Sequence, residues 1–465
     1  MSRKILVIGL DAAPPHLVFE EFRKQLPNIT HLAQNGLYGP LRSTHPPITI
    51  PAWIVMMTSR NPGTLGIYGF RHRKKNTYNE IYIVNSRSIK ERAVWDYLSE
   101  NNKRSIIISV PPGYPPRIIR GYWISCFITP SNSKKYTFPL SLREEIESHF
   151  GPYIFDADFR IENREKVRQD VFRMTKQHFD VVEYLIQQKK WDFFMFVEIG
   201  VDRIQHAFWK FFDKEHHLYE PGNEFEHVIP EYYEYIDRRI GELLEKIGED
   251  TYVLIVSDHG AKRMKGAFVI NEWLAEQGYL EFEREPREVV NLDRAEINWD
   301  KTIAWGWGGY YARVFINLEG REPNGIVKRE DYEDVRQQLI EDIRKIRGPN
   351  GEPMKNLAYR PEDLYPITKG DPPDLIVYFD DLYWRSAGTV GHNKLYLPEN
   401  DIGPDDAVHD WDGIFILYDP QETLNRERRN AEIKDIAPTI LNLLGLPIPE
   451  NMEGRSLVSG DDIHG

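Results

Sequence analysis

The sequence predicts an α/β protein, a three-layer α/β/α sandwich around a mostly parallel sheet, with insertions near the strand ends. Short apolar runs rich in Ile, Val and Phe alternate with amphipathic segments. Parallel strands that are covered on both faces have this composition, and the alternation is typical of the α/β class. At 465 residues the chain can bury a large core, which we interpret as one domain over residues 1–465.

The expected elements follow from these runs in chain order. Five apolar runs are expected to be buried strands: Lys4–Leu10, Ser105–Val110, Asp192–Val197, Tyr252–Val256 and Asp374–Phe379. Apolar residues recur at near-helical spacing in Glu165–Gln188 and Glu231–Ile247, and each of these segments leads into a strand. A further helix is expected at Tyr332–Ile346.

Two regions interrupt the alternation. Residues 111–160 are rich in proline, aromatic residues and serine, whereas residues 283–370 are charged and irregular. We interpret the first as an insertion and the second as an insertion or cap lobe. Both could determine substrate selectivity, or they could be surface segments with no role at the site.

Composition excludes several classes of protein. The net charge of −13 argues against binding to a nucleic-acid duplex. Cys126 is the single cysteine, so neither an intrachain disulfide nor a cysteine metal cluster can form. No apolar run approaches the ~20 residues that span a bilayer, and the N-terminal run suits a strand better than a signal peptide. We expect a cytoplasmic protein; the sequence gives no indication of its oligomeric state.

Aspartates follow three of the expected strands. Asp11 follows the first run, Asp202 follows the third after a short turn, and Asp258 and His259 follow the fourth. A polar strand end before a turn would also explain the last pair. Open α/β sheets place ligands at the carboxyl ends of their strands, and carboxylates gathered there raise one another's pKa values. Divalent cations would remove this conflict.

Three further residues are candidates for the same edge of the sheet. His206 lies one helical turn after Asp202, so both could hold one cation, although a helix cap and an unrelated histidine would give the same pattern. Thr49 precedes Pro51 at an expected helix start and could be an N-cap or a nucleophile. His409 precedes a late apolar run and, taken alone, is most simply structural.

In their order along the chain, these residues resemble the motifs of the alkaline phosphatase superfamily. The similarity is greatest to its branch of type I phosphodiesterases and nucleotide pyrophosphatases, including proteins described as phosphohydrolases or phosphomutases. It extends from Asp11 to His409, and Asn451–Leu457 is similar to the C-terminal signature of that family. The resemblance implies an alkaline phosphatase-like fold.

The resemblance also implies a role for each residue. One cation would be held by Asp11, Thr49, Asp258 and His259, and a second by Asp202, His206 and His409, with His392 as the rival to His409. Thr49 would be the nucleophile of a phosphohydrolase acting on small phosphate monoesters or diesters, nucleotides among them. Zinc is the expected metal and manganese the second choice. The alternatives are a cofactor-independent phosphomutase with the same metal site and a non-catalytic metal-binding scaffold.

The sequence departs from the family pattern at one position. Related diesterases carry an asparagine downstream of the nucleophile that binds a phosphoryl oxygen, and counting without gaps reaches Phe70 here. Arg71, His72 and Arg60 are the candidate replacements. Thr49 occupies the position where sulfatases need cysteine or serine, so a sulfatase is not expected.

Overall fold

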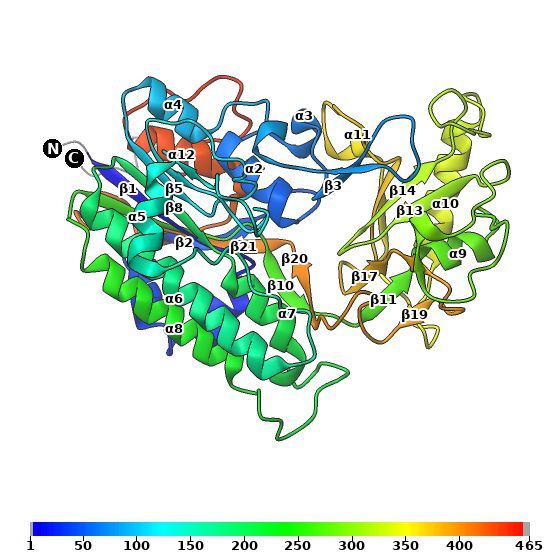
Figure 1. The fold of residues 1–465 in the computed structure, drawn as a ribbon, viewed down its shortest axis with the longest axis horizontal. Coiled ribbons are helices and arrows are strands. Elements are labelled where there is room, and N and C mark those ends of the chain that lie inside the picture. The colour runs from blue at the N-terminus through cyan, green and yellow to red at the C-terminus, as the bar shows by residue number, and fades with distance from the viewer. Residues whose placement is uncertain (1–2, 459–465) are drawn as a thin grey trace.

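The computed structural model describes residues 3–458 as a three-layer body with a smaller lobe at one side (Figure 1). The body is built on a ten-stranded sheet in the order β22-β2-β21-β9-β1-β8-β5-β6-β7, with β23 also paired to β2. Its strands are β1 (Lys4–Leu10), β2 (Gly36–Arg42), β5 (Ser105–Ile108), β6 (Gly121–Ile124), β7 (Thr137–Phe138), β8 (Phe193–Glu198), β9 (Thr251–Val256), β21 (Asp412–Tyr418), β22 (Glu427–Arg428) and β23 (Ala431–Glu432).

The centre of this sheet is parallel. β1 pairs in parallel with β8 on one side and β9 on the other, and β5 continues the parallel order between β8 and β6. β21 is antiparallel to both β9 and β2. The predicted α/β fold around a mostly parallel sheet is therefore confirmed.

Helices cover both faces of the sheet (Figure 1). One face packs on α1 (Pro27–Gln34), α5 (Ser141–Phe150), α6 (Arg164–Gln188), α7 (Gly200–Phe212) and α8 (Val228–Leu244). The other packs on α2 (Thr49–Thr58), α3 (Pro62–Leu65), α4 (Val94–Glu100) and α12 (Ile436–Leu443). Alternate residues of β1 enter the two cores, because successive strand side chains point to opposite faces.

The lobe, residues 266–397, contains its own sheets and hydrophobic core. Its strands are β11 (Gly266–Val269), β12 (Val290–Asn291), β13 (Ala304–Trp307), β14 (Ala312–Ile316), β15 (Leu357–Tyr359), β16 (Leu375–Tyr378), β17 (Trp384–Ala387), β18 (Thr389–Val390) and β19 (Tyr396–Leu397). Its helices are α9 (Ile270–Glu276), α10 (Tyr332–Lys345) and α11 (Pro361–Leu364). It contains residues 283–370, the expected insertion or cap lobe, and extends beyond them on both sides.

The chain itself and several packing contacts join the lobe to the body, as where the Tyr68 hydroxyl donates to the Lys369 carbonyl at 2.8 Å. The chain enters the lobe after β10 (Gly260–Arg263) and returns before β20 (Ala407–Asp410), and these two strands pair with each other. The hairpin of β3 (Arg71–Arg73) and β4 (Ile81–Ile83) also contacts the lobe. There the Tyr78 ring stacks on Trp299 with ring centroids 3.6 Å apart.

The structure corrects the interpretation of two segments. Strand Asp374–Phe379 is observed as β16, but it is antiparallel to β14 and β15 in the lobe. Its composition resembled that of a central parallel strand because both of its faces are buried in hydrophobic clusters. Residues 111–160, expected as an insertion, contribute β6 and β7 to the edge of the main sheet and α5 to one of its faces. Both strands are short and lie in a proline-rich segment, so neither gives a clear strand pattern in the sequence.

Candidate active site

The carboxyl ends of three neighbouring strands bring together the residues expected there. Asp11 follows β1, which lies between β8 and β9, so Asp258 and His259 after β9 lie beside it. The backbone N–H of Ala12 donates to Asp258 Oδ1 at 3.2 Å and fixes this neighbourhood. The turn after β8 leads directly into α7, which carries Asp202.

Asp11, Asp258 and His259 form the first cluster. His259 Nε2 lies 3.1 Å from Asp258 Oδ2 and 3.7 Å from Asp11 Oδ1. One potential ligand atom of each residue lies within 4.8 Å of the others. All three side chains are fully buried, so carboxylate and imidazole donors converge on one point away from solvent.

Thr49 lies against the first cluster. Its Oγ1 is 3.2 Å from His259 Nε2 and 3.5 Å from Asp11 Oδ1. Thr49 is the first residue of α2, and Ile48 in extended conformation takes the N-cap position, so the threonine hydroxyl is not used as the cap. The free N–H groups at the start of a helix favour an anion near that hydroxyl.

Asp202, His206 and His409 form the second cluster. Asp202 and His206 are one turn apart on α7, with Asp202 Oδ1 at 3.1 Å from His206 Nε2 and 3.8 Å from His409 Nε2. His409 reaches the cluster because β20 pairs with β10 and places it opposite Ala261. The rings of His259 and His409 stack with centroids 3.8 Å apart, so the two clusters are adjacent.

Hydrogen bonds orient all three histidines in the same way. Nδ1 of His259 lies 2.9 Å from the carbonyl oxygen of Gly260, and Nδ1 of His409 lies 2.9 Å from that of Pro47. Nδ1 of His206 faces a carboxylate oxygen at 2.7 Å. Carbonyl and carboxylate oxygens only accept, so Nδ1 carries a proton in all three histidines and Nε2 is directed into the clusters. Burial lowers the pKa of His206, but the charges of Asp202, Tyr310 and Asp405 raise it well above its ordinary value, so a cation at this cluster would replace the proton on its Nε2.

The electrostatics of the clusters favour bound cations. Burial raises the pKa of Asp11 and Asp258 well above the usual range, with further contributions from Asp202 to the first and from Asp11 to the second. Burial also lowers the pKa of His259 to about 4 and that of His409 well below its ordinary value, so both imidazoles are neutral. Neutral imidazoles and closely spaced carboxylates are the form that divalent cations bind.

Unpartnered polar atoms show that the donor set fits such ions. Among the buried side-chain atoms of the two clusters, three have no hydrogen-bond partner: Asp202 Oδ1, His206 Nε2 and Asp258 Oδ2. Buried polar atoms normally have partners. Because each of these atoms faces its own cluster, a cation in each cluster would satisfy them.

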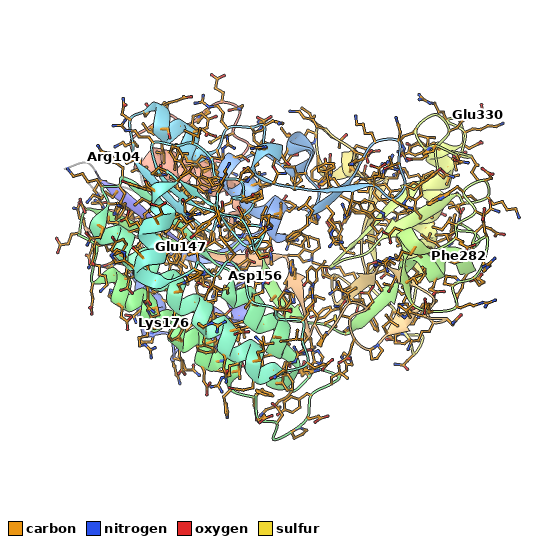
Figure 2. The ribbon with its side chains drawn as sticks, in the orientation of Figure 1. Arg104, Glu147, Asp156, Lys176, Phe282 and Glu330 are labelled. Carbon is orange, nitrogen blue, oxygen red and sulfur yellow. The ribbon has the colours of Figure 1, made fainter. Side chains whose placement is uncertain are left out.

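The structure adds residues that sequence reasoning missed. Trp53 Nε1 donates to Asp11 Oδ2 at 2.8 Å. Arg203 Nη1 donates to Asp202 Oδ2 at 2.6 Å and its Nε to Asp156 at 2.7 Å; Asp156 is labelled near the centre of Figure 2. From the lobe, the Tyr310 ring stacks on His409 with centroids 4.0 Å apart. Trp53 follows Thr49 by one helical turn, a spacing that could have identified it, whereas Tyr310 has no comparable signal.

The rival histidine and the candidate asparagine replacements make other contacts. His392 lies in the lobe after β18, with Nε2 2.7 Å from Thr389 Oγ1. The structure therefore places His409, rather than His392, beside Asp202. Of the candidate replacements, Arg60 donates to the Asn451 carbonyl and His72 accepts from the Tyr68 N–H, whereas Arg71 is bonded to Arg313 only through its backbone carbonyl. Phe70, at the ungapped position, packs on Phe127.

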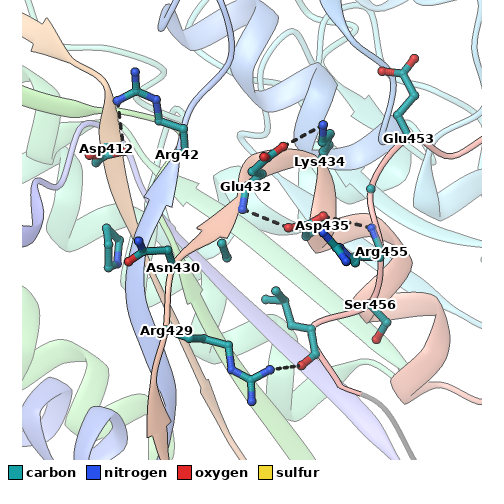
Figure 3. Close-up of a pocket in the computed structure, with 14 residues that line it drawn as sticks. Arg42, Asp412, Arg429, Asn430, Glu432, Lys434, Asp435, Glu453, Arg455 and Ser456 are labelled. Atoms are coloured by element: carbon teal, nitrogen blue, oxygen red, sulfur yellow. Dashed lines mark hydrogen bonds and ion pairs between the residues drawn. The ribbon is translucent and has the colours of Figure 1, made fainter.

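A large surface cleft lies away from these clusters. It has a volume of about 1020 Å³ and is lined by β2, β23 and the segment after α12 (Figure 3). Its cationic side chains face acidic ones, as in the pairs Arg42–Asp412 at 3.5 Å and Lys434–Glu432 at 2.7 Å. None of the seven predicted site residues lines it. The clusters, not this cleft, are therefore the candidate active site.

Within residues 3–458, no helix has the length and apolar character needed to cross a membrane.

No curated protein sequence matches the chain. Solved structures do match, and their low identity to this chain makes the likeness one of fold. Phosphonoacetate hydrolase from Sinorhizobium meliloti, in complex with phosphonoacetate, is 13% identical over 96% of both chains with a TM-score of 0.62. Human ectonucleotide pyrophosphatase/phosphodiesterase 5 is 12% identical over 97% of both chains with a TM-score of 0.55.

A family profile covers most of the chain. Residues 5–405 match type I phosphodiesterase/nucleotide pyrophosphatase, a family of phosphoric ester hydrolases. The matched stretch includes every predicted site residue except His409. The chain therefore belongs to the type I phosphodiesterase/nucleotide pyrophosphatase family of the alkaline phosphatase superfamily.

Proposed function

We propose that this protein hydrolyses small phosphate esters with Thr49 as the nucleophile and with two divalent cations bound at the two clusters. The observation that carries the proposal is the position of Thr49 Oγ1, 3.2 Å from His259 Nε2 at the buried N-terminus of α2. Asp11, Asp258 and His259 would hold the first cation together with Thr49. Asp202, His206 and His409 would hold the second.

The chemistry follows from these positions. Bound cations would neutralise phosphoryl oxygens and lower the pKa of the threonine hydroxyl. Thr49 Oγ1 then forms a bond to phosphorus as the ester oxygen departs, and water hydrolyses the resulting phosphothreonine. The backbone N–H groups of Thr49 and Ile50, at the start of α2, would stabilise the developing negative charge, since Pro51 has no N–H and the Ala52 N–H donates to the Ile48 carbonyl. Trp53 holds Asp11 in place. Positioning and charge neutralisation are the main contributions of the chain.

The donor set guides the choice of metal. Three imidazoles and three carboxylates, with no thiolate, suit first-row divalent ions. We propose zinc as the natural metal and manganese as the alternative. Metal analysis of protein purified without chelators would distinguish them, and two equivalents per chain are expected.

The test is a comparison of Thr49→Ala with the wild type. Substrates would be p-nitrophenyl phosphate, bis-p-nitrophenyl phosphate and nucleotides, each with zinc, manganese and magnesium. Loss of a nucleophile reduces turnover by several orders of magnitude, so we expect a loss of at least about 1000-fold with cation binding largely retained. Activity within a few fold of the wild type would show that Thr49 is not the nucleophile.

Burial of the site supports phosphomutase activity as the second candidate. The seven residues are at most 4% exposed, and Tyr310 of the lobe covers His409. A mutase needs such exclusion of water, so that the phosphothreonine passes its phosphoryl group to a second hydroxyl. Incubation with a phosphosugar or phosphoglycerate would separate the two: an isomer without free phosphate indicates a mutase, and free phosphate indicates a hydrolase.

A further inference from the structure

Asp405 lies behind the second cluster, in the segment that returns from the lobe to β20. Its side chain is buried and its two oxygens accept from four residues. Oδ1 lies 2.7 Å from His206 Nδ1. Oδ2 accepts from Arg160 Nε at 3.1 Å and Nη2 at 2.9 Å, from Arg385 Nη1 at 3.0 Å, and from the Tyr310 hydroxyl at 3.2 Å.

These donors come from both parts of the molecule. His206 and Arg160 belong to the body, whereas Tyr310 and Arg385 belong to the lobe. The Arg385 guanidinium also lies over the Tyr310 ring, 4.9 Å from its centroid, so the two lobe residues act as one unit. The Asp405 carboxylate therefore connects the lobe to His206 of the second cluster through hydrogen bonds to both.

The Nδ1 atoms of the other two cluster histidines are not held by a side chain that the lobe positions, although the Tyr310 ring also stacks on His409. Their Nδ1 atoms donate to the backbone carbonyls of Gly260 and Pro47, which are part of the body itself. A backbone carbonyl is less free to reorient than a side-chain carboxylate, although the segment before Pro47 also touches the lobe, where the His45 carbonyl accepts from the Tyr365 hydroxyl. Among the three histidines, His206 is the one whose orientation depends on a side chain that the lobe helps to hold.

We propose that Asp405 is a positioning residue that makes cation binding at the second cluster depend on docking of the lobe. Asp405 fixes the ring of His206 and keeps its proton on Nδ1, while Arg385 and Tyr310 keep Asp405 in place only when the lobe is closed. Such partners behind a metal-binding histidine typically change affinity about 10- to 100-fold. Because coupling is reciprocal, a cation at the second cluster must in turn favour the docked lobe. This inference rests on the proposed function for the two cation sites.

The first arm of the test measures zinc binding without measuring activity. Zinc would be titrated calorimetrically into chelator-treated wild-type protein, Asp405→Asn and Asp406→Asn. For Asp405→Asn we expect one site to weaken about 10- to 100-fold and the other to keep its affinity. Asp406→Asn is the matched control, because Asp406 is an equally buried neighbour whose carboxylate faces Arg164 and Lys210, each at 3.6 Å. It should bind two zinc ions as the wild type does.

The second arm tests the link to the lobe. Arg385 bonds to Asp405 and not to a residue of the cluster. The Arg385→Gln substitution should nevertheless weaken zinc binding at the second site about fivefold or more. Hydrogen exchange of β17 should slow when zinc fills the second site of the wild type, and this protection should be lost in Asp405→Asn. Equal zinc affinity of Asp405→Asn and wild type, or an unchanged Arg385→Gln, overturns the inference and leaves the proposed function standing. A wild type that binds fewer than two zinc ions overturns both.

Discussion

Replacing Trp53 by Phe would remove one hydrogen bond from Asp11 while keeping an aromatic ring in the core. Trp53 is fully buried in α2, and its indole N–H donates to Asp11 Oδ2 at 2.8 Å. The ring also lies close to β1, since a Cβ at Gly9 would come within 2.6 Å of it. The N–H therefore supports Asp11 in the ionised form that a cation requires.

The size of the effect follows from this contact. A hydrogen bond to a charged acceptor contributes about 1.5–3 kcal/mol. At about 1.4 kcal/mol per tenfold change in a binding constant, its complete loss corresponds to zinc binding that is weaker by about 10- to 150-fold at the first cluster. The second cluster contains no atom bonded to Trp53, so its affinity should stay unchanged.

Trp123→Phe provides the control for this experiment. Trp123 is equally buried, but its Nε1 donates to the neutral carbonyl of Gly113 at 2.8 Å, away from both clusters. This variant should lower the free energy of unfolding by about 1 kcal/mol without changing zinc affinity, measured by calorimetry and urea unfolding. Unchanged zinc binding in Trp53→Phe would refute the role of the Trp53–Asp11 hydrogen bond. Equal weakening of zinc binding in both variants would show that the effect comes from a general loss of packing.

Three further outcomes are expected. Burial raises the pKa values of Asp11 and Asp258 in the metal-free protein, so their stabilising contribution is present at acid pH and lost as the pH rises. The melting temperature of chelator-treated protein should therefore fall as the pH is raised from the acid range, and added zinc should abolish this fall. Burial raises the pKa of the Cys126 thiol to about 12, so a thiol reagent should label no cysteine in the native protein and one after denaturation. Tyr310→Ala should uncover His409 and raise the activity toward bis-p-nitrophenyl phosphate relative to the monoester; an unchanged ratio would mean that Tyr310 does not limit access.

The body of the fold and the positions of the cluster residues could be predicted because they depend on local geometry. Parallel strands end at one edge of a sheet, so an aspartate after β1 must lie beside one after β9 once the two strands pair. Asp202 and His206 share a face of α7 by helical spacing alone. These relations hold whatever the rest of the chain does, and a single sequence contains them.

The remaining site residues depend on contacts between distant segments. Tyr310 and Arg385 reach His206 only through the docking of a lobe whose strands pair in an order that no periodicity reveals. The sheet that β16 joins is also not predictable from the sequence, because burial on both faces gives a strand the same composition in either sheet. Composition reports how deeply a strand is buried but not which sheet it joins.

The pairing of β10 and β20 separates the cluster residues, which lie in the body, from the lobe inserted between these two strands. The lobe is inserted between these paired strands, so its size and sequence can vary without displacing His409, which the ladder holds opposite Ala261. Five other cluster residues lie on strand ends or on α7, outside the lobe. The lobe contributes the Tyr310 ring, which stacks on His409. It also helps to hold Asp405, which is hydrogen-bonded to His206. Under the proposed function, changes in the lobe would therefore alter which esters enter and how firmly a cation is held at the second cluster.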